Sequence, residues 1–214
     1  MDSGPTLGEK GVRPVTRIGI IVGSTRPHRH AHDVAGWALQ LASLRGDATY
    51  EIVDLRDHPL PLLDEPMPPS MGHYQHEHTR RWAATVAGFD GFVIVTPEYN
   101  HSVPAVLKNA LDYLYAEWNH KAIGFISYGT HGGVRAVEHL RAIAGELMMA
   151  DVRAQVVLPF ATDFENHRIF TPREHASRVL GVMLDQVVAW SEALAPLRRR
   201  AEAERRARAA APDA

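Results

Sequence analysis

The sequence contains no cysteine, which excludes disulfides, thiolate catalysis and cysteine metal sites together. It also lacks an excess of either charge, because 23 Lys and Arg stand against 25 Asp and Glu. The charge therefore gives no global argument for binding nucleic acid or an anionic membrane. No apolar run approaches the length of a membrane span, and residues 1–14 lack the apolar segment of a secretory signal. We expect a soluble, cytoplasmic protein that binds neither nucleic acid nor membrane.

The length of 214 residues fits one ordinary domain and is short for two. We expect a flexible N-terminal extension over residues 1–15, a single domain over residues 16–197 and an Arg/Ala-rich C-terminal tail over residues 198–214. The tail interleaves Glu202 and Glu204 among its arginines, which is typical of a solvated helix extension or a frayed end. Nucleic-acid or partner binding by this tail is the alternative.

Five apolar, β-branched runs alternate with longer segments of helical periodicity. The runs cover residues 18–22, 50–55, 92–96, 122–127 and 155–159. Such alternation favours an α/β fold with a parallel sheet covered on both faces. Five strands with crossover helices fit the doubly wound order 2-1-3-4-5, in which a ligand binds beyond the carboxyl ends of the strands.

Apolar residues spaced three and four apart predict the buried faces of three helices. These faces are Val103, Leu107, Ala110, Leu111 and Leu114; Val137, Leu140, Ala144, Leu147 and Met148; and Leu180, Leu184, Val187, Ser191 and Leu194. Ser102, with Pro104 in the first turn, predicts the start of the first of them. Five prolines between His58 and His73 exclude a regular helix and predict an irregular loop, either functional or mobile.

The loop after the first strand has the composition of an anion site. Gly23-Ser24-Thr25-Arg26 follows a strand and precedes a helix, and backbone N–H groups at a helix N-terminus bind anions in this arrangement. Ser24 and Thr25 offer hydroxyl donors, and Arg26 offers a fork of charged donors. We expect a phosphate here, while a plain turn is the alternative.

Two further loops open on the same edge of the predicted sheet. After the third strand, Pro97-Glu98-Tyr99-Asn100 places an aromatic ring and polar groups just before a helix. After the fourth strand, Ser127-Tyr128-Gly129 and Gly132-Gly133 let the backbone approach a flat ligand closely. Together with the anion loop, they predict a pocket for a phosphorylated planar cofactor.

These motifs, together with Lys108-Asn109-Ala110, resemble those of the NADPH-dependent FMN reductase family, in the same order over about residues 16–190. The resemblance implies a flavodoxin-like three-layer sandwich with FMN as cofactor and NADPH or NADH as co-substrate. It implies that Ser24 and Arg26 hold the FMN phosphate. It further implies that residues 97–100 line the isoalloxazine and that residues 128–133 meet its pyrimidine edge.

The resemblance also implies the chemistry and the assembly. NADPH would deliver hydride to the flavin, and a small or flat acceptor would then take it; quinones, free flavin, azo dyes and chromate all remain open. No catalytic acid or base is expected, and Glu98 is expected to cap or pair locally. Members are usually homodimers or dimers of dimers with the flavin near the interface. Tyr115 and Trp118 are candidates for that interface, and ordinary core packing is the alternative.

One segment departs from the family pattern. Related sequences often place glycine or another small residue where this chain has His28 and Ala31. The segment from His28 to His32 either tightens phosphate binding through Arg29 or narrows the loop.

Three other functions compete with the reductase. A non-catalytic flavin-binding carrier or sensor is disfavoured by the near-neutral charge and by Arg26. A DNA-associated protein would use the Arg-rich tail. A metal site could form at His28, His30 and His32 or at His73, His76 and His78, but neither group has the accompanying carboxylate pattern. We therefore expect no metal and interpret these histidines as facing solvent.

Overall fold

The computed structural model describes residues 15–210 and is built on a five-stranded parallel sheet in the order β2-β1-β3-β4-β5. The strands are β1 (Arg17–Val22), β2 (Thr49–Asp54), β3 (Gly91–Pro97), β4 (Ala122–Gly129) and β5 (Ala150–Pro159). The predicted α/β class and strand order are confirmed. Every residue of β3 and β4 is buried, which explains why these strands are continuous apolar runs rather than alternating ones.

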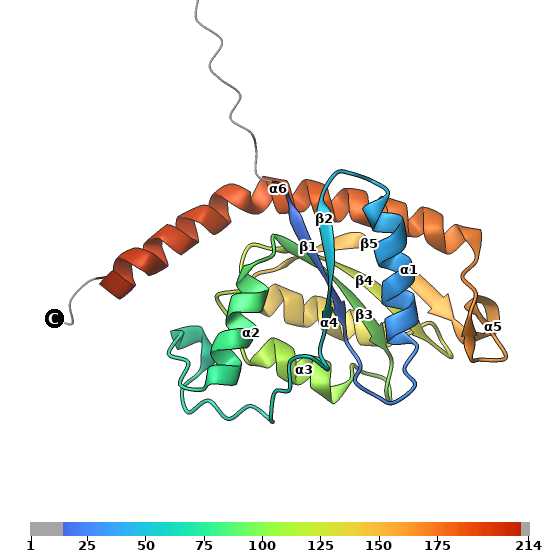
Figure 1. The fold of residues 1–214 in the computed structure, drawn as a ribbon, viewed down its shortest axis with the longest axis horizontal. Helices are drawn as coiled ribbons and strands as arrows, with labels where there is room; N and C mark the ends of the chain where they lie inside the picture. The colour runs from blue at the N-terminus through green and yellow to red at the C-terminus, as the bar shows by residue number, and fades with distance from the viewer. Residues whose placement is uncertain (1–14, 211–214) are drawn as a thin grey trace, which may run out of the picture.

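Helices cover both faces of the sheet (Figure 1). One half of the hydrophobic core lies between the sheet and the helices α1 (Ala31–Ser43) and α6 (Glu174–Ala210). The other lies under α2 (Glu77–Ala87), α3 (Ala105–Asp112) and α4 (Val134–Glu146). The flavodoxin-like three-layer arrangement is thereby confirmed, and it leaves the carboxyl ends of the strands as one open edge.

Within residues 15–210 there are four further short elements: η1 (Pro69–Met71), α5 (Phe160–Asp163), β6 (Phe164–Glu165) and β7 (Ile169–Phe170). The strands β6 and β7 pair as an antiparallel hairpin that the sequence patterns did not predict. Each strand has only two residues, too few to show a periodicity of two. In Figure 1, α5 lies beside the N-terminal end of α1.

The structure corrects three predictions about the helices. The helix α3 begins at Ala105, because Pro104 is extended, and Ser102 instead exchanges backbone hydrogen bonds with Tyr99. Met148 is exposed rather than part of the α4 face, since α4 ends at Glu146. Trp118 is fully buried and donates its indole N–H to a backbone carbonyl, so it is a core residue and not an interface residue.

The helix α6 continues past the expected domain end at residue 197. Arg198 is buried and donates to Asp90 Oδ1 at 2.7 Å and to the carbonyl of His120 at 3.0 Å. The later turns extend beyond the body of the molecule (Figure 1). Residues 1–14 of the expected extension and residues 211–214 of the expected tail lie outside the described residues. Between residues 15 and 210, no helix combines the length and apolarity needed to cross a membrane.

Candidate functional site

The loops after β1, β3 and β4 meet at the carboxyl edge of the sheet around a pocket of about 460 Å³. This size lies within the range of small-molecule sites. The pocket is lined by Arg26, Pro27, His28, Arg29, His30, Pro97, Glu98, Tyr99, Tyr128, Gly129, Thr130, Phe160 and His167. The prediction that three loops converge on one site is confirmed, and α5 and the β6–β7 hairpin add residues that no motif indicated.

The loop after β1 is joined to the loop after β3. Gly23 donates its N–H to the carbonyl of Val95 at 2.8 Å, and a Cβ on Gly23 would lie 2.8 Å from that same oxygen. Only glycine fits this close approach, which joins the start of the loop to the end of β3. Ser24 Oγ then lies 2.9 Å from the hydroxyl of Tyr99 and 3.4 Å from the backbone nitrogen of Arg26. The two loops are therefore held as one unit.

Arg29 is the buried cation of the pocket, with its side chain only 4% exposed. Its Nη2 pairs with Asp54, at the end of β2. Its Nε and Nη1 are buried and have no hydrogen-bond partner within the part of the chain that the structure describes. Buried donors are almost always paired, so these two nitrogens are available to a hydrogen-bond acceptor that is not part of the chain. Arg26, by contrast, is exposed.

Arg56 supports the same loop and was missed by sequence reasoning. Its Nη2 donates to the carbonyl of Arg26 at 2.9 Å, and its Nε and Nη2 both lie 3.3 Å from the carbonyl of Thr25. Arg56 follows the neighbouring strand β2, about thirty residues away in the chain. No local pattern could have indicated it, because the contact arises only from the pairing of β2 with β1.

Glu98 forms an ion pair with Arg135 and accepts the backbone N–H of Arg135 at 3.2 Å. Burial opposes ionisation, but the hydrogen bonds from Arg135 outweigh it and hold the pKa of Glu98 below its usual value. The prediction that Glu98 caps or pairs is confirmed, although its partner lies at the start of α4 rather than nearby in the chain. Glu98 is consequently an ionised and neutralised carboxylate at the pocket wall.

The glycine-rich loop after β4 is shaped by backbone conformations that favour glycine. Gly129, Gly132 and Gly133 have φ values of 143°, 71° and 74°. Ser127 is fully buried and donates to the carbonyl of Gly132 at 2.7 Å, so it braces the turn from behind. Tyr128 and Gly129 line the pocket. The other predicted site residues of the three loops are not part of the lining: Ser24, Thr25, Asn100, Ser127, Gly132 and Gly133.

An aromatic cluster forms the inner wall of the pocket. The ring of Tyr128 lies about as far from His30 (6.2 Å) as from Phe160 (6.3 Å) and Phe164 (6.2 Å). Burial, followed by the neighbouring Tyr99, raises the pKa of Tyr128 above its ordinary value, so its phenol stays neutral. The rings of this wall are inclined to one another, with interplanar angles of 86° between His30 and Tyr128 and 51° between Tyr128 and Phe160.

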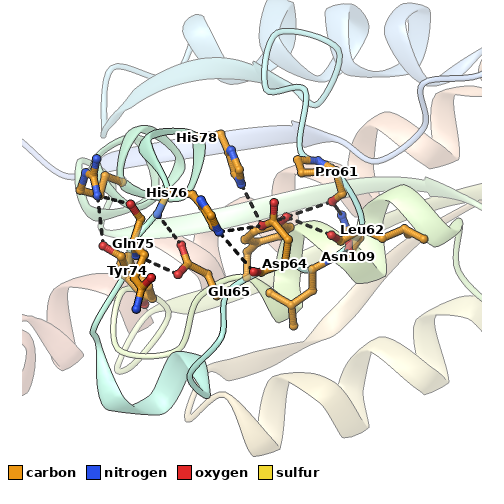
Figure 2. Close-up of polar contacts among 12 residues, drawn as sticks. Pro61, Leu62, Asp64, Glu65, Tyr74, Gln75, His76, His78 and Asn109 are labelled. Carbon is orange, nitrogen blue, oxygen red and sulfur yellow. Dashed lines mark hydrogen bonds and ion pairs between the residues drawn. The ribbon is translucent and has the colours of Figure 1, made fainter.

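The proline-rich loop after β2 is held in place by a separate polar cluster. Figure 2 shows His76 and His78 pointing toward Asp64, whose Oδ1 lies 3.0 Å from His78 Nε2 and accepts the hydroxyl of Tyr113 at 2.9 Å. Asn109 accepts the N–H of Leu63 and donates to the carbonyl of Pro61. The loop is thus fixed by contacts along its length.

The structure corrects the interpretation of three histidines as facing solvent. His30 packs against the aromatic wall of the pocket, and the other two belong to this cluster. His76 and His78 do not simply face solvent, because they stack on each other and bind the loop through Asp64. Burial opposes ionisation of Asp64, but the hydrogen bonds from His78 and Tyr113 hold its pKa below the usual value. Among the described residues, no group of three or more His, Asp or Glu side chains is arranged to hold a metal ion.

Comparisons with known proteins agree with these features. The family model described as NADPH-dependent FMN reductase matches residues 16–163. An NAD(P)H-dependent FMN reductase of Schizosaccharomyces pombe is 40% identical over 178 residues, covering 82% of this chain and 89% of that protein. A 2-hydroxy-1,4-benzoquinone reductase of a Burkholderia species is 33% identical over 138 residues, covering 61% and 71%.

Solved structures show the same fold. FerB of Paracoccus denitrificans, a flavoenzyme NAD(P)H:(acceptor) oxidoreductase, superposes with a TM-score of 0.64 at 23% identity. The match covers 83% of this chain and 98% of that one. At this level of identity, the likeness concerns the fold.

Proposed function

The chain belongs to the NADPH-dependent FMN reductase family, and we propose that it passes hydride from NADPH through bound FMN to a small or flat acceptor. Quinones, free flavin, azo dyes and chromate are the acceptor classes we propose. Relatives named as a quinone reductase and an azoreductase support the first and third of these. The chain is accordingly an oxidoreductase that uses FMN and NAD(P)H.

The two unpaired donors of Arg29 carry the assignment of the pocket to FMN. A buried guanidinium with Nε and Nη1 free matches a phosphate group, which accepts several charged hydrogen bonds at once. The hydroxyls of Ser24 and Thr25 and the side chain of Arg26 belong to the same loop. We propose that these four residues hold the phosphate.

The loops after β3 and β4 form the rest of the pocket, and we assign this part to the isoalloxazine of FMN. We propose that Pro97, Glu98, Tyr99 and Asn100 line one part of the isoalloxazine and that residues 127–133 shape the loop at its pyrimidine edge. When bound, FMN supplies the centre that accepts and donates hydride.

The chain's own residues then bind, orient and shield this group. We propose that the rings of Tyr128 and Phe160, which line the pocket, limit the access of water to the bound group. Arg135 neutralises Glu98, so no free carboxylate repels an electron-rich ring. No residue of this pocket needs to act as a general acid or base.

A visible spectrum of the purified full-length protein tests the proposal. We expect a yellow protein whose flavin band bleaches when NADPH is added without oxygen and returns when a quinone or free flavin is supplied. A colourless protein that does not oxidise NADPH in the presence of added FMN would refute the function. A protein that holds flavin but does not oxidise NADPH would be a carrier or sensor instead.

We also propose that the protein is a homodimer. The loop after β2 exposes Leu62, Leu63, Met67 and Met71 on a fixed backbone, and Leu62 is 82% exposed. Exposed apolar patches of this kind mark association sites. We expect Leu62→Glu to lower the sedimentation coefficient toward that of a monomer. Leu44→Glu, at an equally exposed leucine beyond α1, should leave it unchanged; equal effects of the two variants would place the interface elsewhere.

Two further proposals concern the surroundings of the protein. We propose a cytoplasmic location, which the absence of cysteine supports and which imaging of a tagged chain would test. We also propose that the Arg-rich end of α6 binds no nucleic acid. A gel shift with duplex DNA at low salt that disappears on removal of residues 199–214 would contradict this.

A further inference from the structure

The β6–β7 hairpin adds a wall to the pocket that lies outside the region matched by the family model. That match ends at residue 163, and the hairpin spans residues 164–170. His167, in the turn of the hairpin, lines the pocket together with Arg26 and His28. Its ring lies 5.8 Å from that of Phe160, which follows β5. This wall therefore belongs to the pocket but comes from a separate segment of the chain.

The base of the hairpin is firmly attached to the fold. The ring of Phe170 lies 5.1 Å from that of Phe164 and 5.6 Å from the indole of Trp37 on α1. Asp163 is fully buried and accepts the backbone N–H of Arg173 at 3.0 Å and its Nη2 at 2.9 Å. These contacts anchor the hairpin on both sides of its turn.

Two histidines of this pocket occupy backbone conformations that would suit glycine better. His167 has a φ of 57° and follows Asn166, with a φ of 49°, in a turn closed by a hydrogen bond from Arg168 N to the carbonyl of Glu165. His28, in the loop after β1, has a φ of 54°. Left-handed residues other than glycine carry a conformational cost. That both line one pocket points to a use for their imidazoles.

The charge of the lining suits an anion. Glu98 is the only carboxylate among the described residues of the lining, and Arg135 neutralises it. Arg26 contributes positive charge, and Arg29 is paired with Asp54 but keeps two unpaired donors. The imidazoles of His28 and His167 can also donate hydrogen bonds.

We propose that His167, carried by the hairpin, binds the phosphate of FMN together with His28 and thereby increases the preference of the pocket for FMN over riboflavin. This inference rests on the proposed function, because it assumes that the pocket holds FMN. The hairpin thus supplies to the phosphate a donor from beyond the matched family region.

The variant His167→Gly tests the proposal without weakening the turn. Asn followed by Gly is the favoured pair for turns in which two residues have positive φ, so the hairpin is kept while the imidazole is removed. Binding of FMN and of riboflavin to the flavin-free full chain is measured by quenching of flavin fluorescence. We expect FMN affinity to fall by about 10-fold and riboflavin affinity to change by less than about twofold. The melting temperature of the flavin-free protein should stay the same or rise.

Arg168→Gln is the matched control, because Arg168 is the next residue of the same turn, is exposed and does not line the pocket. An equal loss of FMN affinity in this control would show a long-range charge effect and overturn the proposal. Equal losses for FMN and riboflavin would also overturn it. Unchanged FMN affinity together with a KM raised for NADPH but not for NADH would overturn it as well. The imidazole would then contact the 2′-phosphate of NADPH instead of the FMN phosphate.

The two levels of inference fail differently. If the wild-type chain binds neither FMN nor riboflavin, the proposed function is wrong. If the wild type binds FMN and His167→Gly binds it equally well, only the role of His167 is wrong.

Discussion

Replacing Arg29 with methionine tests the phosphate site most directly. The side chain is buried, its Nη2 is paired with Asp54, and its Nε and Nη1 are free. Methionine retains an unbranched side chain in this space but removes every donor. If the free nitrogens receive the phosphate of FMN, their loss should weaken FMN binding and leave riboflavin binding unchanged.

The magnitude follows from the number and burial of these donors. A hydrogen bond to a charged group contributes about 1.5–3 kcal/mol, and more is lost when the partner is buried. Because two such donors are lost, we expect Arg29→Met to weaken FMN binding by about 150-fold or more. Arg26 is exposed, so water replaces much of its contact, and Arg26→Met should cost less, about threefold to tenfold.

The ion pair must be separated from the phosphate contact. Removing Arg29 also leaves Asp54, only 13% exposed, without its cation, and this alone destabilises the fold. The double variant Arg29→Met with Asp54→Asn removes that unpaired charge. We expect it to recover thermal stability in the flavin-free state but not FMN affinity.

Titration of FMN and riboflavin, together with thermal unfolding of the flavin-free protein, measures both effects. Recovery of FMN affinity in the double variant would show that Arg29 acts only through its ion pair. An FMN affinity within about twofold of the wild type in the single variant would refute the assignment of the phosphate to Arg29.

Three further predictions concern stability. Burial raises the pKa of Glu98, but hydrogen bonds from Arg135 outweigh it and hold this pKa below its usual value of about 4.5. The wild type should therefore be more stable than Glu98→Gln by about 1 kcal/mol above pH 5, and this advantage should shrink below about pH 4.5 and vanish as the pH falls through the lowered pKa of Glu98 in the folded protein. Urea unfolding at pH 7 and pH 3 measures it, and an advantage that persists at pH 3 would contradict the reasoning. Gly132→Ala would place a Cβ against a β5 side chain at a φ of 71° and should cost about 2–4 kcal/mol. Gly36 lies within α1 and has open space where a Cβ would be, so Gly36→Ala should instead raise the free energy of unfolding by about 0.5–1 kcal/mol. Thermal unfolding measures both variants, and a Gly132→Ala protein more stable than Gly36→Ala would contradict both arguments. Burial and a nearby arginine lower the pKa of Lys121 to about 7, so the unfolded chain binds more protons above that pH. The free energy of unfolding of the wild type relative to Lys121→Met should rise from pH 7 to pH 9 with a slope of up to about 1.4 kcal/mol per pH unit. If this difference does not change with pH, the pKa of the Lys121 amine is not lowered in the folded protein.

The strand order could be predicted because each strand carries its own signal. Runs such as residues 18–22 and 92–96 are apolar and β-branched, and parallel strands with right-handed crossovers allow few arrangements. The three loops could be placed on one edge for the same reason, since the carboxyl ends of all five strands share it.

Local patterns failed where a neighbour in space overrides them. Ser102 has the side chain of a helix cap, yet its backbone pairs with Tyr99 and the helix starts after Pro104. Trp118 is an aromatic residue of the kind that is enriched at protein interfaces, but it is enclosed by core side chains from several elements. Neither outcome can be derived from spacing along the chain.

The sequence alone determined the fold class, the strand order and the chemical character of the three loops, because hydrophobic periodicity and turn residues are local properties. The tertiary structure decided which cation of the pocket is buried with free donors, how Arg56 supports the loop after β1, and that the hairpin brings His167 to the same pocket. These features depend on contacts between residues far apart in the chain. Only the packing of strands and helices brings such residues together.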